Sequence, residues 1–192
     1  PPGPYNGDMK TLAFPQRGLG KASVRSRGDI EIASGQEYRS STYGHLNLFW
    51  RDDLVLKGQK GNADNAPPYG FIGRETIDRG GFAIYAHGGY AQSIYADAIQ
   101  KNVNAVELLQ FGVYRGIELA DWYAFLNVGH RFACVGASDY PACRKLSDCL
   151  TYVYSEKRPS FDGWLKGAVE GQSYVTTGPL LLLEVEGRKP GG

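Results

Sequence analysis

The chain has 192 residues, of which 42% are hydrophobic and 21% charged, as is ordinary for a globular domain with a sizeable core. Lys and Arg (21) almost balance Asp and Glu (20), so the formal net charge is only +1. Because no block of basic residues is present, the sequence argues against nucleic acid and against a membrane surface as partners. Apolar runs such as residues 180–183 are far too short to span a bilayer.

The two ends of the chain carry no clear periodic pattern. The first 28 residues are rich in Gly, Pro and basic residues, which is typical of an irregular lead-in. The chain has no starting Met and no signal peptide, and residues 187–192 resemble a turn that leads onward. We therefore expect a fragment of a longer polypeptide, with a further β segment starting after residue 179 and the compartment left open.

Short β-type runs alternate with helical runs after the lead-in. Residues 29–38 (DIEIASGQEY) predict a strand, and residues 44–50 (GHLNLFW) predict another. A polar, Gly/Pro/Asn-rich loop is expected over 57–69 and a short helix over 75–79. The apolar run at 81–87 (GFAIYAH) predicts the next strand.

The second half of the chain continues the alternation. Helices are expected at 94–100, 117–127 and 161–170, and the last two are each followed by a glycine suited to a C-cap. Strands are expected at 105–111, 131–139, 150–155, 173–177 and 180–185.

This alternation is typical of an α/β fold with a largely parallel sheet. No glycine-rich dinucleotide-binding motif follows the first strand. We therefore expect an incomplete α/β barrel, and we treat residues 1–192 as a single domain.

Residue types that bind metals recur at the ends of the expected strands. Glu37, His87 and Asp139 each end a strand, and His45 begins the strand that follows Glu37 after a short loop. In an α/β barrel the carboxyl ends of the strands converge on one mouth, where active sites lie. We therefore expect Glu37, His45, His87 and Asp139 to be metal ligands.

Imidazole and carboxylate together suit Zn, Mn or Fe, whereas carboxylates alone would favour Mg or Ca. Such an ion lowers the pKa of a bound water and polarises a carbonyl or phosphoryl oxygen. Small residues next to the expected ligands let the backbone approach a crowded site. They are Gly35, Gly88, Gly89, Gly136 and Ala137.

Each expected ligand has a structural alternative. Glu37 could be a surface residue of a strand, and His45 and His87 could be hydrogen-bonded histidines of the core. Asp139 could cap a turn, since Pro141 follows it. The third histidine, His130, precedes a strand at the end away from the expected mouth, and we interpret it as structural.

Four further residues are candidates for contacts with a substrate. Arg144 could stabilise negative charge on an anionic substrate or intermediate, although a solvated arginine explains it equally well. Tyr38, Arg39 and Tyr43 flank Glu37 and His45 and could line the pocket, with aromatic packing as the alternative.

Three cysteines, Cys134, Cys143 and Cys149, form no Cys-x-x-Cys pair, which argues against a structural zinc ribbon. Cys143 and Cys149 could form a disulfide in an oxidising compartment, and free thiols are the alternative.

Several blocks of this sequence resemble the PHP superfamily (polymerase and histidinol phosphatase), and more narrowly its CehA/McbA branch of carbaryl-hydrolase-like metallohydrolases. The blocks occur in the family's order. They are GQEYRSSTYGHLNLF (residues 35–49), YAHGG (85–89), DWYAFLNVGHRFACVGASDY (121–140) and GQSYVTTGPLLLLEVEG (171–187).

The resemblance implies a distorted (β/α)7 barrel with two or three metal ions at the carboxyl ends of its strands. It assigns Glu37 to the family's bridging glutamate and His45 to the histidine of the same block. His87 corresponds to the histidine of the family's Ala-His-Pro motif, and Asp139 to its late aspartate. The chain departs from the family in two respects. Residues 1–32 contain no His-x-His motif, and the histidine that often stands two residues after the late aspartate is absent, since Pro141 occupies that position.

We therefore expect a metal-dependent hydrolase that acts on a small molecule through an ester, carbamate, amide or phosphoester bond. The missing His-x-His motif favours the alternative of a degenerate, non-catalytic PHP-like module. A metal-free α/β domain that binds a small ligand is a third interpretation, but it leaves the histidines and carboxylates unexplained.

Overall fold

The structure is a computed structural model, and it describes residues 19–40, 43–55, 67–87, 93–110, 113–114, 116–140, 143, 145–180, 182 and 184–188. The chain divides into two compact units, which are described separately below. Unit 1 comprises Pro1–Ala86 and Tyr90–Val103, and unit 2 comprises His87–Gly89 and Asn104–Gly192.

The described part of unit 1 opens with a 3-10 turn, Gly20–Ser23, and an antiparallel ribbon of β1 (Arg25–Arg27) and β2 (Ile30–Ile32). The single strand expected over 29–38 is therefore interrupted. The backbone N–H of Ser34, between β2 and β3, donates to the Ser23 hydroxyl of the 3-10 turn at 2.8 Å.

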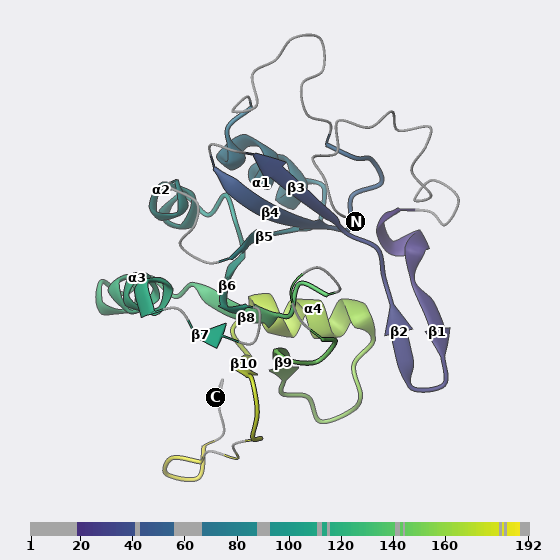
Figure 1. Ribbon diagram of the computed structural model, residues 1–192, viewed down its shortest axis with the longest axis vertical. Helices are drawn as coiled ribbons and strands as arrows, with labels where there is room; N and C mark the ends of the chain where they lie inside the picture. The colour runs from purple at the N-terminus through teal and green to yellow at the C-terminus, as the bar shows by residue number, and fades with distance from the viewer. Residues whose placement is uncertain are drawn as a thin grey trace. The chain divides into compact units, whose positions relative to one another are not determined.

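The main sheet of unit 1 contains β3 (Gln36–Ser40), β4 (Gly44–Phe49) and β5 (Phe82–Ala86). Both pairings, β3 with β4 and β4 with β5, are antiparallel (Figure 1). Burial alternates along β4, where Leu46 and Leu48 are buried and the residues between them are partly exposed. This period of two marks one face of the sheet as the core face.

Helix α1 (Tyr69–Asp78) covers that core face and buries Tyr69, Ile72 and Thr76. The spacing of three and four residues is that of a single helical stripe. The Tyr69 hydroxyl donates to the backbone carbonyl of Gly44, at the start of β4. The helix begins at Tyr69 and not at the expected residue 75. The sequence does not indicate this start, because the first turn of the helix lies in a Pro/Gly-rich stretch that resembles a loop.

Helix α2 (Ile94–Ile99) is joined to β5 of the same unit by hydrogen bonds. The hydroxyl of Tyr85 contacts the carboxylate of Asp97 and lies 2.8 Å from the Ser93 hydroxyl. Both Tyr85 and Asp97 are buried, so this contact satisfies polar groups inside the core.

In unit 2, β8 (Ala133–Ala137) pairs in parallel with β6 (Ala105–Gln110), and β7 (Val113–Tyr114) pairs with β6 in the antiparallel sense. Helix α3 (Gly116–Asn127) lies in the connection between β7 and β8. A helical crossover of this kind is what lets β8 run parallel to β6.

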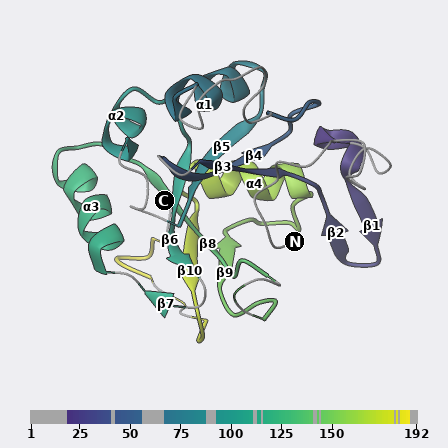
Figure 2. The same cartoon turned by 45° about the horizontal axis from the view of Figure 1, so that its top comes forward.

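The rest of unit 2 contains β9 (Leu150–Val153), helix α4 (Phe161–Val169) and β10 (Ser173–Thr176). β9 and β10 are antiparallel, and both lie beside β8 together with α4 (Figure 2). The Ser160 hydroxyl accepts the backbone N–H of Gly163 at 3.2 Å and so caps α4. A strand over 180–185 is not seen in the described residues, where an isolated bridge joins Val185 and Arg188.

The expected α/β class is confirmed, but the expected parallel sheet is wrong. Of the pairings within the two units, β6 with β8 is parallel and the others are antiparallel. One physical reason is the length of the connection between β3 and β4, because the three residues 41–43 are too few for the crossover that parallel strands need. No closed barrel is found among the described strands.

The described residues also settle two smaller questions. Cys134, Cys143 and Cys149 are free thiols, so the alternative of a Cys143–Cys149 disulfide is wrong for this structure. None of the described helices combines the length and apolarity that a membrane span requires.

Candidate metal centre

The first expected ligand, Glu37, lies on the face of β3 opposite to the core. Strand alternation places Tyr38 on the core face and Glu37 and Arg39 on the other. The two carboxylate oxygens of Glu37 have different partners. Oε1 lies 2.9 Å from Nδ1 of His45, and Oε2 accepts two N–H groups of Arg39 at 3.0 and 2.6 Å.

His45 reaches Glu37 because of the strand register. His45 pairs with Arg39 on β3 and with Ala86 on β5, so all three lie on the same face of the sheet. About a quarter of the His45 side chain and of the Glu37 side chain is exposed. The pair is therefore partly buried and accessible to a small ion.

His87 joins this pair through a break in the strand geometry. It directly follows Ala86, and in a regular strand its side chain would point away from His45. Its φ angle of 61° is in the left-handed region, which ends the alternation at this residue. One ligand atom each from Glu37, His45 and His87 lies within 4.8 Å of the others.

The backbone of His87 is held by a buried carboxylate. Its N–H donates to Oε2 of Glu107 at 2.9 Å, and Nδ1 of the ring lies 3.9 Å from the same oxygen. His87 and Glu107 are both buried. The left-handed backbone conformation costs a residue with a Cβ about 1–2 kcal/mol of free energy. Such a conformation therefore persists where surrounding contacts hold it.

These three side chains fit a divalent ion. Ligand atoms about 2.0–2.2 Å from a tetrahedral zinc ion are roughly 3.5 Å apart. The ligand atoms of the three residues lie within 4.8 Å of one another, which is close to this spacing. Two imidazoles and one carboxylate also form one of the ligand sets of catalytic zinc sites, in which a position stays open. The chemistry of the donors therefore suits a divalent metal ion.

Asp139, the fourth expected ligand, lies outside this group of described ligand atoms. It follows β8 in unit 2 and has a φ angle of 50°, also in the left-handed region. Its Oδ2 accepts the thiol of Cys143 at 3.2 Å, and its carbonyl accepts the Cys143 N–H at 3.1 Å. Both contacts join Asp139 to Cys143, and the expected role of Asp139 as a metal ligand stays a prediction.

Of the four residues expected to contact a substrate, the three that the structure describes differ in their exposure and contacts. Arg144 lies outside the described residues. Tyr38 is buried in the core, where its ring packs edge-on against Tyr69 at 5.6 Å. Tyr43 is partly exposed, and its ring centroid is 5.4 Å from that of Tyr69. Arg39 therefore has the most direct relation to the cluster, since it contacts Glu37.

Glu107 is a residue of the site that the sequence reasoning missed. It lies in β6 between Val106 and Leu108, and all three are buried. A carboxylate inside an otherwise apolar strand is costly unless it is hydrogen-bonded or paired. That isolated charge in the run AVELLQF was the signal that could have identified it.

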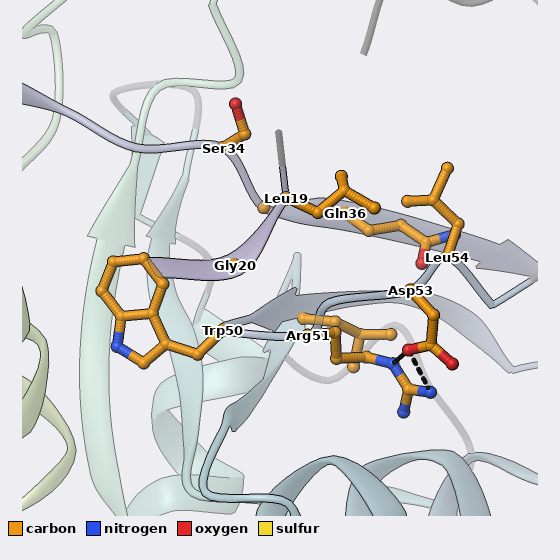
Figure 3. A pocket seen from close by; sticks show the side chains of 10 residues that line it. Leu19, Gly20, Ser34, Gln36, Trp50, Arg51, Asp53 and Leu54 are labelled. Carbon is orange, nitrogen blue, oxygen red and sulfur yellow. Dashed lines mark hydrogen bonds and ion pairs between the residues drawn. The ribbon is translucent and has the colours of Figure 1, made fainter. Parts of the chain in front are cut away.

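A small pocket elsewhere in unit 1 has room for about one water molecule. Figure 3 shows its wall, with Arg51 beside the carboxylate of Asp53 and with Gln36 and Leu54 nearby. Neither histidine of the cluster lines it. The pocket is therefore a packing feature and not the candidate metal site.

No family model and no curated protein matches the chain. Among solved structures, the chain is similar to a two-domain protein from Bacteroides vulgatus that contains a predicted PHP-like metal-dependent phosphoesterase. The TM-score is 0.50 at 15% identity, and the match covers 73% of this chain and 43% of that protein. The chain thus spans less than half of its length. At this identity the likeness concerns the fold alone.

Proposed function

We propose that this chain is a metal-dependent hydrolase domain of PHP-like fold that cleaves phosphoesters. The observation that carries the proposal is the cluster of Glu37, His45 and His87, whose ligand atoms lie within 4.8 Å of one another. A purely structural role explains the cluster less well. Packing alone does not require two imidazoles and a carboxylate to converge, nor a strained backbone at one of them.

In this proposal Glu37, His45 and His87 hold the ion, and Asp139 completes the ligand set. A divalent ion held there supplies a Lewis acid that makes water an effective nucleophile near neutral pH. Arg39 and Arg144 offer guanidinium groups for the oxygens of an anionic substrate, for which their planar geometry is suited. Tyr43, partly exposed beside the β3–β4 turn, would contact the rest of the substrate.

The bond that the domain cleaves is part of the proposal. The resemblance of the sequence blocks to the CehA/McbA branch favours an ester or carbamate carbonyl. The structurally similar protein from Bacteroides vulgatus contains a predicted PHP-like metal-dependent phosphoesterase. We adopt the phosphoester and treat the carbonyl substrates as the comparison. We further propose that residues 1–192 belong to one domain related to the distorted (β/α)7 barrel.

The proposal is tested first by metal content. The full chain is purified and reconstituted with Zn, Mn or Fe, dialysed, and analysed by plasma mass spectrometry. We expect close to one or more equivalents of metal in the native chain, and at least about a tenfold loss of affinity in His87→Ala. His130→Ala is the matched control, because His130 is exposed and lies outside the cluster. A native chain that binds no metal, or a His87→Ala variant that binds as well as His130→Ala, would overturn the proposal.

Substrate class is tested on the metal-loaded chain with bis-p-nitrophenyl phosphate, p-nitrophenyl phosphate, and p-nitrophenyl acetate. We expect metal-dependent hydrolysis of a phosphoester that His87→Ala abolishes and His130→Ala retains. Hydrolysis of the acetate alone would favour the carbonyl substrates. Stoichiometric metal without any turnover would instead favour the non-catalytic PHP-like module.

A further inference from the structure

Glu107 is buried at 4% exposure in β6, and its neighbours Val106 and Leu108 are also buried. Its carboxylate oxygen Oε2 accepts the backbone N–H of His87 at 2.9 Å. A left-handed backbone conformation persists where its surroundings hold it, and a buried hydrogen bond from the His87 N–H to an oxygen acceptor is such a restraint.

The conformation matters because it decides where the imidazole lies. A regular continuation of β5 would place the side chain of His87 on the face opposite to His45. The φ angle of 61° removes it from that position. The Nδ1 atom lies 3.9 Å from Glu107 Oε2, which exceeds hydrogen-bonding distance, so the direct contact of the carboxylate is with the backbone.

We propose that Glu107 is a positioning residue that locks the backbone of His87 and so directs its imidazole to the metal site. The inference rests on the proposed function, because it assigns His87 to the metal. Glu107 acts through an acceptor oxygen and does not ligate the ion. Its role therefore requires an oxygen at Oε2 but no negative charge.

The experiment compares Glu107→Gln and Glu107→Ala in the full chain. Zinc affinity is measured by competition with a chromophoric chelator, and thermal stability is measured on the metal-free protein. We expect Glu107→Gln to bind zinc within about threefold of the native chain, because the amide oxygen still accepts the His87 N–H. We expect Glu107→Ala to bind about 10–100-fold more weakly, as is common when a residue that orients a ligand is removed.

Val106→Ala is the matched control for loss of stability. It opens a cavity in the same strand without touching His87. We expect it to lower thermal stability while leaving zinc affinity near the native value. If Val106→Ala weakens zinc binding as much as Glu107→Ala, the effect is general destabilisation and the positioning role is wrong. If Glu107→Gln binds as weakly as Glu107→Ala, the carboxylate is itself a ligand, which also overturns the proposal.

A second measurement does not depend on metal. In the metal-free, 15N-labelled chain, hydrogen exchange of the His87 amide should be slow in the native protein and in Glu107→Gln, and at least about tenfold faster in Glu107→Ala. Unchanged exchange in Glu107→Ala overturns the positioning role, whatever the metal data show. A native chain with slow exchange but no zinc binding overturns the proposed function instead, while the contact of Glu107 with His87 is upheld.

Discussion

The Nδ1 atom of His45 lies 2.9 Å from Oε1 of Glu37, while the other oxygen of that carboxylate is held by Arg39. The carboxylate of Glu37 thus contacts both the imidazole of His45 and the guanidinium of Arg39. A metal ion bound by Glu37 would replace the contact with His45, while the positive charge of Arg39 would remain close to the ion. Metal affinity is therefore expected to depend on Arg39.

Substitution of Arg39 by Gln should strengthen metal binding. The guanidinium repels a divalent ion that shares Glu37 with it, although partial exposure screens the effect. We expect zinc affinity to rise by roughly threefold or more, measured by chelator competition. If Arg39 also binds an anionic substrate, KM of the loaded enzyme should rise in the same variant. A drop in zinc affinity would show that Arg39 mainly orders Glu37 for the ion.

Substitution of Tyr69 by Phe should destabilise unit 1. The Tyr69 hydroxyl donates to the carbonyl of Gly44 inside the core, and its removal leaves a buried acceptor without that donor. We expect a loss of about 1–3 kcal/mol in the free energy of unfolding, measured by urea denaturation. Tyr123→Phe is the control, since Tyr123 is half exposed, and it should change stability by less than about 0.5 kcal/mol. Equal effects in the two variants would contradict the importance of this hydrogen bond.

The three cysteines should differ in their rates of alkylation. Burial raises the pKa of the Cys134 thiol to about 11, and burial together with the charge of Glu107 raises that of Cys149 to about 11. Both thiols therefore stay protonated at pH 8, whereas Cys143 is exposed. Iodoacetamide at that pH should label Cys143 first in the folded chain and all three cysteines in urea, as peptide mass spectrometry would show. Rapid labelling of Cys149 in the folded chain would mean that the start of β9 opens readily.

The closeness of Glu37 and His45 was expected from the sequence, but the strand arrangement that produces it differs from the expected one. Both residues were expected to lie in one site, and their side chains are 2.9 Å apart. The expected cause was convergence of parallel strand ends, with Glu37 at the end of its strand. In the structure Glu37 is the second residue of β3, and antiparallel pairing brings the residues together.

The features that escaped prediction depend on tertiary contacts. The left-handed φ angle of His87 has no signal in the neighbouring sequence. The hydrogen bond that holds this residue is accepted by Glu107, which lies 20 residues further along the chain. The split of the strand expected over 29–38 likewise depends on the Ser34–Ser23 hydrogen bond. Periodicity identifies strands well, but it does not specify which strands pair, and pairing determines which side chains meet.

Stability should depend on pH through Asp53, which pairs with Arg51 at 2.8 Å and with Arg79 at 3.0 Å. Burial alone would raise the pKa of Asp53, but the two guanidinium groups outweigh it and hold the pKa below the ordinary value of 3.8. The carboxylate is favoured in the folded state, so its contribution to stability is complete above pH 3.8 and is lost as pH falls through the lower, folded pKa.

Asp53→Asn tests this dependence. The variant should be less stable than the native chain in urea at pH 7, and the difference should shrink as the pH is lowered below 3.8, because the native carboxyl then becomes neutral as well. Asp78→Asn is the control, because Asp78 forms an exposed pair with Arg74 within one helix, where such pairs contribute little. A stability difference between Asp53→Asn and the native chain that stays constant from pH 7 to pH 2 would mean that the ion pairs with Arg51 and Arg79 do not stabilise the fold. The buried Arg51 would then depend on its hydrogen bond to Thr76, which is 3.0 Å long.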